Sequence, residues 1–523
     1  MASSSAVQEF ADANLRAKMA SLGMAIHYTR AEGNTLYYRD AENREVAVTD
    51  FVGSFGSLMF GHNHPEIVAR AKEILDNQTP IFTLMLGHSY ANEVATALNA
   101  IVRRELATDE PYFGFFANSG AEGVEVVIKH AEFDRQARAA ELIAEVEANL
   151  EAARAAVADG AVIADGAFDS LGLAAAEGID GLVAEVTRAN AEVAALPPVF
   201  LALERAFHGK LVASVNLTYN PDLRLPFTRL GPRARFVPSD APDRLREVVA
   251  EERRQVFDVQ VADGVVSVVR RDFPIFAGFF VEPIRGEAGI KPVNAEYARE
   301  IERVCAELDC PIVLDEIQSG MGRTGTFFAS THIGLRGDYY VLAKSLGGGI
   351  AKTSAVLVRE RRYRKDFELL HSSTFAKDSF SSLIALKVLE LLEAEDGAAY
   401  RKAAERGERL TEVLTGLWKE YPDVIKEVRG RGLMLGVEFQ DQLDASSPAI
   451  RGIAEEGFLG FGIASYLLRE HKIRTFPTAS ATTTLRLEPS IHVTDAEIEK
   501  LDTALRDLCA LVHAQDDRWL AQA

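Results

Sequence analysis

The sequence predicts an α/β fold built on a mainly parallel β-sheet whose faces are covered by helices. Short apolar runs recur along the chain and are mostly separated by segments of helical periodicity, an alternation typical of parallel sheets. Several runs stop at a polar or charged side chain, where the carboxyl ends of parallel strands meet and ligands bind. The expected strands are 113–116, 199–203, 277–281, 312–314 and 339–342.

The length of 523 residues and the hydrophobic content of 48% indicate a globular protein with more than one folding unit. We expect residues 62–378 to form a large domain that holds the parallel sheet. The mixed helix and strand patterns of residues 1–61 and 379–523 predict a smaller α+β domain assembled from both ends of the chain.

Two segments interrupt the regular alternation of strands and helices. Within the first of them, residues 133–197, an apolar helical stripe from about 138 to 158 is followed by a second helical pattern near 182–195, so we expect a helical hairpin. Residues 252–272 contain two β-branched runs around Asp263-Gly264, which predicts a β-hairpin. The residues of the apolar stripe are Leu142, Val146, Leu150 and Val157.

The composition narrows the class of partner. The formal net charge is -20, from 57 Lys and Arg against 77 Asp and Glu, so most of the surface would repel nucleic acid and a small-molecule substrate is favoured. No apolar stretch is long enough for a membrane span, and the first five residues lack the features of a secretion signal, so we expect a cytoplasmic protein. Two histidines in His62-Asn63-His64-Pro65 are too few for a metal site, and we expect none.

The strongest chemical signal is a pair of opposite charges at the ends of two neighbouring apolar runs. Residues 312–314 lead into Asp315, and residues 341–343 lead into Lys344. Taken alone, the two could form a buried ion pair. They also suit pyridoxal phosphate, because a lysine amine forms an imine with the cofactor aldehyde and a carboxylate keeps the ring nitrogen protonated.

Two further strand ends favour the same cofactor. Asn118-Ser119-Gly120-Ala121-Glu122 follows an apolar run and opens a helix, where free amide groups form a phosphate cradle. An ordinary helix cap would have the same sequence. Phe207 follows the run 199–203 and could lie flat against a pyridine ring, although a core position would also suit it.

Together these motifs resemble the class III pyridoxal-phosphate-dependent aminotransferases, which include ornithine, acetylornithine and 4-aminobutyrate aminotransferases. A fainter resemblance is to natural-product pathway members such as the caerulomycin aminotransferase. The resemblance implies fold type I, with a mainly parallel seven-stranded sheet in the large domain. The motifs lie at 118–122, 207–209, 282–287, 315–325, 343–349 and 429–433 and cover most of the chain apart from the two insertions.

The resemblance assigns a cofactor role to particular residues. It implies that Lys344 is the Schiff-base lysine, Asp315 the partner of the pyridinium nitrogen, and Gln318 a neighbour of the phenolic oxygen. Thr374 resembles a threonine that reaches the phosphate from a neighbouring subunit, which implies a homodimer with shared active sites. The other expected cofactor-binding residues are Ser119, Gly120, Ala121, Phe207, His208 and Glu282.

The resemblance also implies how substrates are recognised. Arg486 matches an arginine that binds the α-carboxylate of glutamate, and its guanidinium suits a carboxylate because of its two parallel N–H donors. Glu287 matches a glutamate that pairs with this arginine when the other substrate has no α-carboxylate. Phe55 stands where the ornithine enzyme has a polar aromatic residue, and Arg285 stands where the family usually has glutamine.

The expected function is a ping-pong transfer of an amino group from a donor such as glutamate to an aldehyde or ketone. The apolar departures favour an acceptor on a biosynthetic scaffold. An ω-amino acid aminotransferase of the ornithine, acetylornithine or 4-aminobutyrate type is the alternative, and a decarboxylase, racemase or aminomutase would share Lys344 and Asp315. Outside enzymes of this kind, the chain could be a cofactor-binding regulator, or its helical insertion could dock a substrate carrier.

Overall fold

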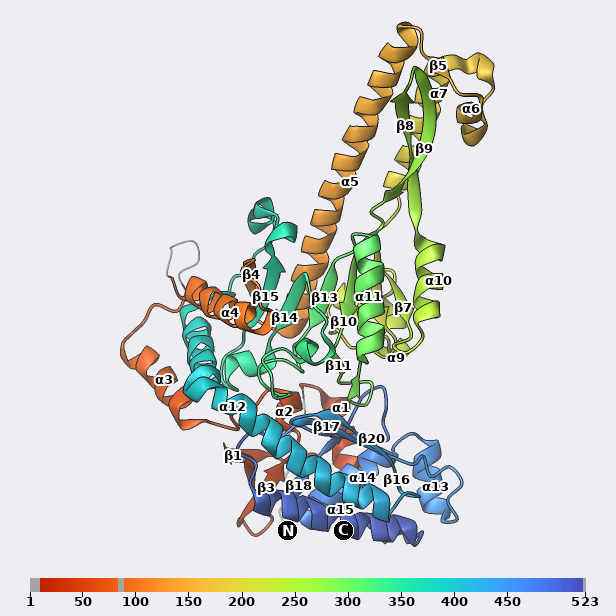
Figure 1. Ribbon diagram of the computed structural model, residues 1–523. Coiled ribbons are helices and arrows are strands. Elements are labelled where there is room, and N and C mark those ends of the chain that lie inside the picture. The colour runs from red at the N-terminus through yellow and green to blue at the C-terminus, as the bar shows by residue number, and fades with distance from the viewer. Residues whose placement is uncertain (1–9, 83–88, 521–523) are drawn as a thin grey trace.

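The computed structural model describes residues 10–82 and 89–520; the first residues, on which the expectation about a secretion signal depends, lie outside this range. A seven-stranded sheet forms the centre of the upper body in Figure 1, and several smaller sheets lie around it. None of the helices in the described ranges has the length and apolarity that a membrane span requires. The same residues contain no cluster of three or more His, Cys, Asp or Glu side chains placed to hold a metal ion.

The seven-stranded sheet confirms the predicted fold class. Six of its strands are parallel, and β15 runs antiparallel to both of its neighbours. Strands β10, β13 and β14 are buried along their whole length because helices cover both faces of the sheet. The spatial order is β4 (Tyr112–Ala117), β15 (Ser354–Arg359), β14 (Tyr339–Leu342), β13 (Ile312–Asp315), β10 (Phe276–Val281), β6 (Val199–Leu203) and β7 (Arg233–Val237).

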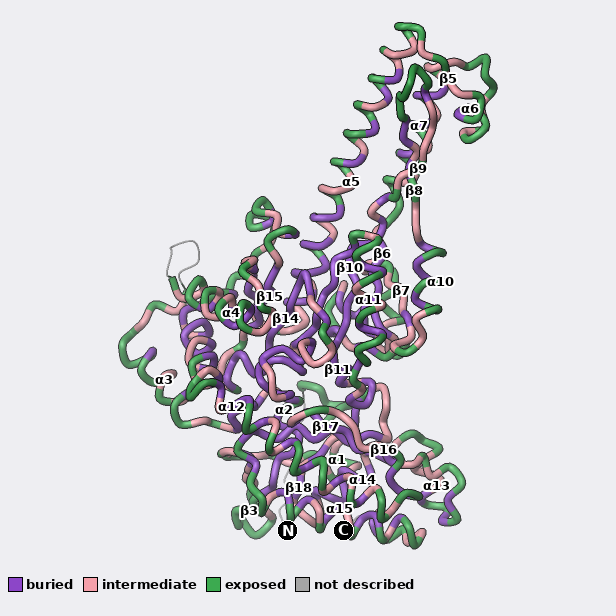
Figure 2. The backbone as a smooth tube through the Cα atoms, viewed as in Figure 1, coloured by how far each residue is buried: buried purple, intermediate pink, exposed green. Residues whose placement is uncertain are grey.

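Long helices pack around this sheet and below it. Helix α12 contacts α3, α4 and the 3-10 helix that begins at Lys344, and it is kinked at residues 394–397. The alternation of buried strands and amphipathic helices therefore produces the layered body of Figure 2, whose buried residues follow the central sheet. The helices are α3 (Pro65–Asp76), α4 (Tyr90–Leu106), α10 (Pro242–Glu252), α11 (Ala295–Glu307) and α12 (Ser379–Glu420).

The two ends of the chain fold together below the large sheet (Figure 1). Strand β18 (Ile473–Arg474) pairs in parallel with β3 (Glu45–Asp50), which continues into β2 (Thr35–Arg39) and β1 (Tyr28–Glu32). A second sheet and four helices complete this part. They are β16 (Ile425–Arg431), β17 (Met434–Phe439), β20 (Thr484–Leu487), β19 (Phe476–Pro477), α1 (Ala13–Ser21), α13 (Pro448–Glu455), α14 (Leu459–His471) and α15 (Asp495–His513).

The two insertions form one arm that projects from the large body (Figure 1). The sequence patterns at residues 120–128 and 138–158 belong to a single 39-residue helix, α5 (Gly120–Ala158), about 58 Å long at 1.5 Å per residue. The stripe residues Leu142, Val146 and Leu150 are buried against the β-hairpin rather than against a second helix alone. The remaining elements are β5 (Val162–Ile163), α6 (Asp165–Leu171), α7 (Gly178–Ala194), β8 (Arg254–Ala262) and β9 (Val265–Phe273).

A buried asparagine joins the helical part of the arm to the β-hairpin. Asn190 of α7 donates from Nδ2 to the Phe257 carbonyl and accepts from the Phe257 amide at Oδ1, both at 2.8 Å. Its side chain thus satisfies two backbone groups at the free edge of β8, which would otherwise be buried without partners. The two insertions, about 55 residues apart in the sequence, are joined by these hydrogen bonds and by the pairing of β5 with β9.

Candidate active site

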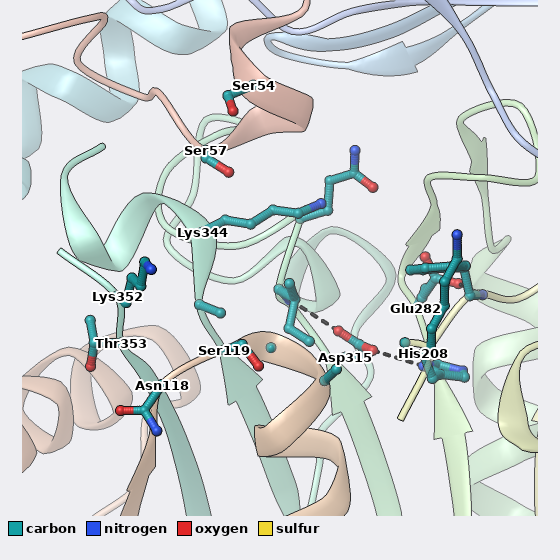
Figure 3. A pocket seen from close by; sticks show the side chains of 18 of the residues that line it. Ser54, Ser57, Asn118, Ser119, His208, Glu282, Asp315, Lys344, Lys352 and Thr353 are labelled. Atoms are coloured by element: carbon teal, nitrogen blue, oxygen red, sulfur yellow. Dashed lines mark hydrogen bonds and ion pairs between the residues drawn. The ribbon is translucent and has the colours of Figure 1, made fainter. Parts of the chain in front are cut away.

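A cavity of about 490 Å³ lies at the carboxyl ends of the parallel strands. Figure 3 shows the side chains that line it, among them Lys344, Asp315 and Ser119. This is the position that parallel sheets provide for ligands. The lining residues also include Ser54, Ser57, Leu58, Asn118, Gly120, Ala121, Phe207, His208, Lys210, Glu282, Glu287, Gln318, Lys352 and Thr353.

Asp315 lies at the base of the cavity and is held by two hydrogen bonds. His208 bonds from Nδ1 to one carboxylate oxygen at 2.7 Å, and the Ile317 amide donates to the other at 3.1 Å. Burial opposes a charged imidazole, yet the hydrogen bond from His208 to Asp315 and the negative charges nearby raise the pKa of His208 above its usual value. A carboxylate fixed in this way presents a stationary negative charge to the cavity.

Glu282 is the second buried acid at this end of the site. It accepts hydrogen bonds from the Phe207 amide at 2.9 Å and from the Gly286 amide at 3.1 Å. Burial raises the pKa of Glu282 to about 7, and neighbouring Asp315 acts in the same direction. Glu282 therefore fixes the backbone beside Phe207, whose side chain lines the cavity.

Lys344 lies directly after β14 and begins a short 3-10 helix with a left-handed backbone, φ 46°. Its side chain extends across the cavity below the turn that carries Ser54 and Ser57 (Figure 3). Burial lowers the pKa of Lys344 below its usual value, because a charged ammonium is less stable away from water. A neutral amine is the form that attacks a carbonyl, so this environment activates Lys344 as a nucleophile.

The start of α5 forms a close-fitting edge of the cavity. Ser119 and Glu122 make a capping box, in which the Ser119 hydroxyl accepts from the Glu122 amide and Glu122 accepts from the Ser119 amide. A Cβ atom on Gly120 would lie 2.8 Å from Ile317 Cδ1, so a larger residue here would require the Ile317 side chain to shift. The first helical amides point to where an anion would bind, and Ser119 is both a helix cap and a lining residue.

Arg486, on β20, and Glu287 form an ion pair beside the cavity; Glu287 lines the cavity, whereas Arg486 and Phe55 lie outside the set of lining residues. Arg486 Nη2 lies 2.6 Å from Glu287 Oε2, and the Phe55 ring lies beneath the guanidinium at 4.9 Å from its central carbon. Burial opposes both charges, but the two groups lower the pKa of Glu287 and raise the pKa of Arg486. Arg486 Nε and Nη1 are buried without a hydrogen-bond partner among the described residues, so the guanidinium keeps donors available for a second carboxylate.

Three residues singled out from the sequence, Thr374, Arg285 and Gln318, are exposed or form hydrogen bonds with residues other than Lys344. Thr374 is exposed and is outside the set that lines the cavity. The adjacent Ser373 accepts a hydrogen bond from Asn118 Nδ2 at 2.9 Å, so this loop borders the cavity. Arg285 is buried and donates to the Glu204 carbonyl at 2.8 Å, and Gln318 donates from Nε2 to Glu488 at 2.8 Å.

Sequence reasoning missed Glu488, Ser54, Ser57, Lys352 and Thr353. Glu488 follows Arg486 by two residues and appears in the sequence as an ordinary charged residue. The serines lie in the segment 53–57, where the closely spaced Gly53 and Gly56 were the only signal of an unusual backbone. Both glycines and the two residues between them have positive φ.

Comparisons with known proteins agree with this geometry. Residues 17–507 match the sequence profile of the family described as Aminotransferase class-III. The ornithine aminotransferase from Toxoplasma gondii superimposes with a TM-score of 0.65 at 20% identity, over 94% of this chain and 92% of that one. The omega transaminase from Pseudomonas jessenii in complex with PMP gives a TM-score of 0.68 at 19% identity, over 98% and 97%.

A third structure, the N-acetylornithine aminotransferase from Stenotrophomonas maltophilia, gives a TM-score of 0.60 at 21% identity, over 94% of this chain and 99% of that one. These likenesses establish the fold, and the profile match extends over most of the chain. The cavity fits the cofactor of this family: an amine-bearing lysine, a fixed carboxylate and a helix start that closes on a glycine all face one space. The chain therefore belongs to the class III aminotransferases and is a pyridoxal-phosphate-dependent aminotransferase.

Proposed function

We propose that this enzyme moves an amino group from an amino acid donor such as glutamate to an aldehyde or ketone acceptor in two half-reactions. The observation that carries the proposal is the buried pair of Arg486 and Glu287, 2.6 Å apart beside the cavity that contains Lys344. A guanidinium with free donors suits the α-carboxylate of an amino acid. When a substrate has no α-carboxylate, the Glu287 carboxylate can pair with Arg486 in its place, so the same cavity can admit both kinds of substrate.

In this proposal each residue of the cavity has a distinct task. Bound pyridoxal phosphate supplies an electron sink for the bonds at the substrate's amine-bearing carbon. Lys344 holds the cofactor covalently and, when released, carries a proton from its Nζ between substrate and cofactor. Asp315, fixed by His208, would hold a proton at the ring nitrogen, and Phe207, which lines the cavity, would contact the ring. The amides after Ser119 bind the phosphate, since a helix start favours an anion.

Alternation of substrates depends on the mobility of Glu287. The Glu287 side chain is 15% exposed, whereas Arg486 is 1% exposed, so the acid has room to withdraw while the arginine stays in place. Glu287 also accepts from the Ala479 amide at 2.7 Å, which holds it near Arg486 when no carboxylate is bound. A donor with an α-carboxylate would displace Glu287, and an acceptor without one would leave the pair closed.

A homodimer completes the site in this proposal. Thr374 is exposed in its own chain, and the neighbouring Phe375 contacts Phe82 with ring centroids 5.2 Å apart while both rings remain more than half exposed. Leu211 and Val212, which follow the lining residue Lys210, are also exposed. Large apolar side chains around a cavity mouth are typical of a surface covered by a partner, and a second copy would bring its Thr374 to the phosphate.

The surroundings of Arg486 favour an acceptor with an apolar portion. Phe55 packs edge-on against Phe476 at 5.7 Å, and Phe476 against Phe461 at 5.5 Å, which makes an aromatic cluster beside Arg486. This favours a bulkier aldehyde or ketone of a biosynthetic pathway. The fold shared with structures named ornithine and N-acetylornithine aminotransferases keeps small ω-amino acids as the second candidate.

Absorbance of the bound cofactor tests the proposal directly. The purified holoenzyme is mixed with glutamate, and the visible spectrum is followed until the amino group has moved to the cofactor. A panel of aliphatic, aromatic and ω-amino aldehydes is then added to the glutamate-treated enzyme after desalting. We expect glutamate to convert the spectrum and an apolar aldehyde to restore it. Failure of every carboxylate-bearing donor to alter the spectrum would refute the proposed donor class.

A further inference from the structure

Glu488 is a buried carboxylate at the edge of the active site to which the transamination chemistry assigns no role. It follows Arg486 by two residues at the end of β20 and is fully buried. Its two carboxylate oxygens accept hydrogen bonds from Gln318 Nε2 at 2.8 and 3.0 Å. Gln318 itself lines the cavity, so Glu488 reaches the site through this amide.

A purely structural explanation would make Glu488 the counter-ion of a buried arginine. Arg323 is one candidate, because the charge of Glu488 acts on it, yet its guanidinium donates to the carbonyls of Leu433, Pro489 and Gly56. Arg486 is paired with Glu287. Within the described ranges no ion pair joins Glu488 to a basic side chain at contact distance, so its only side-chain hydrogen-bond partner there is the Gln318 amide.

The backbone around Glu488 is built to hold it close. Residues 53–56 form one left-handed turn, with φ between 51° and 80° at each residue. Such a backbone is strained for the two non-glycine residues, Ser54 and Phe55. A Cβ atom on Gly53 would lie 2.2 Å from the Glu488 carbonyl oxygen, and one on Gly56 would lie 3.1 Å from Oε1. The strained turn therefore closes over the Glu488 side chain, and backbone strain of this kind is typical of functional sites.

The chemistry of the pair fixes which way the Gln318 amide points. An ionised carboxylate can only accept hydrogen bonds, so the amide nitrogen must face Glu488. The amide oxygen lies against the α-carbon of Gly286, where a Cβ atom would be 1.8 Å from it. The two hydrogen bonds to Glu488 therefore oppose a rotation that would exchange the amide nitrogen and oxygen. The end of the amide that meets a bound cofactor is thus set in advance.

We propose that Glu488 is a positioning residue that fixes the side-chain amide of Gln318 for the bound cofactor. The inference depends on the placement of Lys344 and Gln318 in the cofactor site and not on the identity of donor or acceptor. Loss of Glu488 frees the amide to rotate, and the bound cofactor then loses a preset hydrogen-bond partner. Preorganisation of this kind depends on the residues behind the contact as much as on the contact itself.

A double-mutant cycle on cofactor binding separates positioning from general stability. The apo forms of wild type, E488Q, Q318A and the double variant are titrated with pyridoxal phosphate, and the dissociation constant is read from absorbance and protein fluorescence. We expect Q318A, which removes the amide, to raise the dissociation constant about five- to thirtyfold, the loss of one hydrogen bond. E488Q, whose own amide can either donate or accept and so no longer dictates the orientation of Gln318, should raise it by up to the same factor. The double variant should bind no more weakly than Q318A, since Glu488 acts through that side chain.

Two controls keep the outcome decisive. Glu316 is a fully buried carboxylate bonded to Ser319 and to the amides of Ala329 and Ser330, and E316Q should leave the absorbance pH titration of bound cofactor unchanged. E488Q and Q318A should move the midpoint of that titration in the same direction. E488D, which keeps the charge but is one methylene shorter, provides a second variant if E488Q does not fold. Additive losses in the cycle, or a titration midpoint in E488Q or E488D equal to wild type, would overturn the proposal.

Discussion

Replacement of Arg486 by alanine should weaken the reaction with glutamate far more than the reaction with an amine that has no carboxylate. The guanidinium is 1% exposed, and two of its nitrogens, Nε and Nη1, are buried without partners in the described structure. A substrate carboxylate could therefore gain two charge-assisted hydrogen bonds, each worth about 1.5 to 3 kcal/mol. Loss of a buried charge partner costs about 2 to 5 kcal/mol in total. We expect kcat/KM for glutamate to fall about 30- to 5,000-fold.

The assay is the first half-reaction, followed by stopped-flow absorbance with glutamate and with a primary amine of similar size. The amine needs no guanidinium, so its rate constant should change less than about threefold, a few tenths of a kcal/mol. Two variants sharpen the comparison. R486K keeps the charge but loses the two-pronged geometry, and should recover only part of the glutamate reaction. E287Q removes the competing acid, and should preserve or improve the reaction with glutamate. Equal losses for both substrates in R486A would refute the carboxylate-binding role.

Three further outcomes follow from the buried polar groups. Burial raises the pKa of Glu282 to about 7 from 4.5. Its contribution to the free energy of unfolding is therefore complete below pH 4.5 and is lost as the pH rises through 7. Between pH 5 and pH 8, the thermal midpoint of apo E282Q should rise relative to that of apo wild type. D315N should keep the cofactor bound but slow proton removal from the donor about 100-fold or more in single-turnover absorbance, and an unaltered rate would contradict its role at the ring nitrogen. N190A leaves the amide and carbonyl of Phe257 buried without partners, at a cost of about 1 to 3 kcal/mol for each group, so hydrogen exchange at the Phe257 amide should accelerate while the rate of the first half-reaction stays at the wild-type value.

The part of the site that depends on strand ends could be predicted from the sequence. Asp315 and Lys344 terminate apolar runs, and the carboxyl ends of parallel strands lie along one edge, so a one-dimensional pattern was enough to place them in one crevice. Ser119 was found for a similar reason, because an apolar run there gives way to a helical pattern whose first amides are free; the capping box with Glu122 emerged only from the structure. The class of fold followed from the same alternation, and the seven-stranded sheet confirms it.

The contacts made between distant segments could not be predicted in this way. Gln318 and Glu488 are 170 positions apart, and no local periodicity connects them. The left-handed turn at residues 53–56 contains Ser54 and Phe55, which ordinarily avoid positive φ, so propensity argued against the observed backbone. The arm was expected as two separate insertions because helix and hairpin patterns are read one segment at a time. Asn190 joins them through the backbone of Phe257, a contact that depends on the folded edge of β8.

The two acids beside Arg486 differ in a way that determines what each can do. Glu287 bonds to the guanidinium and to one backbone amide, and its side chain retains some exposure to the cavity. Glu488 has no exposure and lies under a strained turn, with the Gln318 amide held against it. An acid that moves aside for a substrate must be able to do so at a small cost in free energy, whereas an acid that orients an amide must stay in place. In the proposed mechanism the exchangeable negative charge would therefore lie on the wall of the cavity, and the stationary one would lie behind it. Loosening the turn at Gly53 should impair cofactor binding, as measured by the cofactor dissociation constant. Burying Glu287 should impair substrate exchange, as measured by the rates of the two half-reactions.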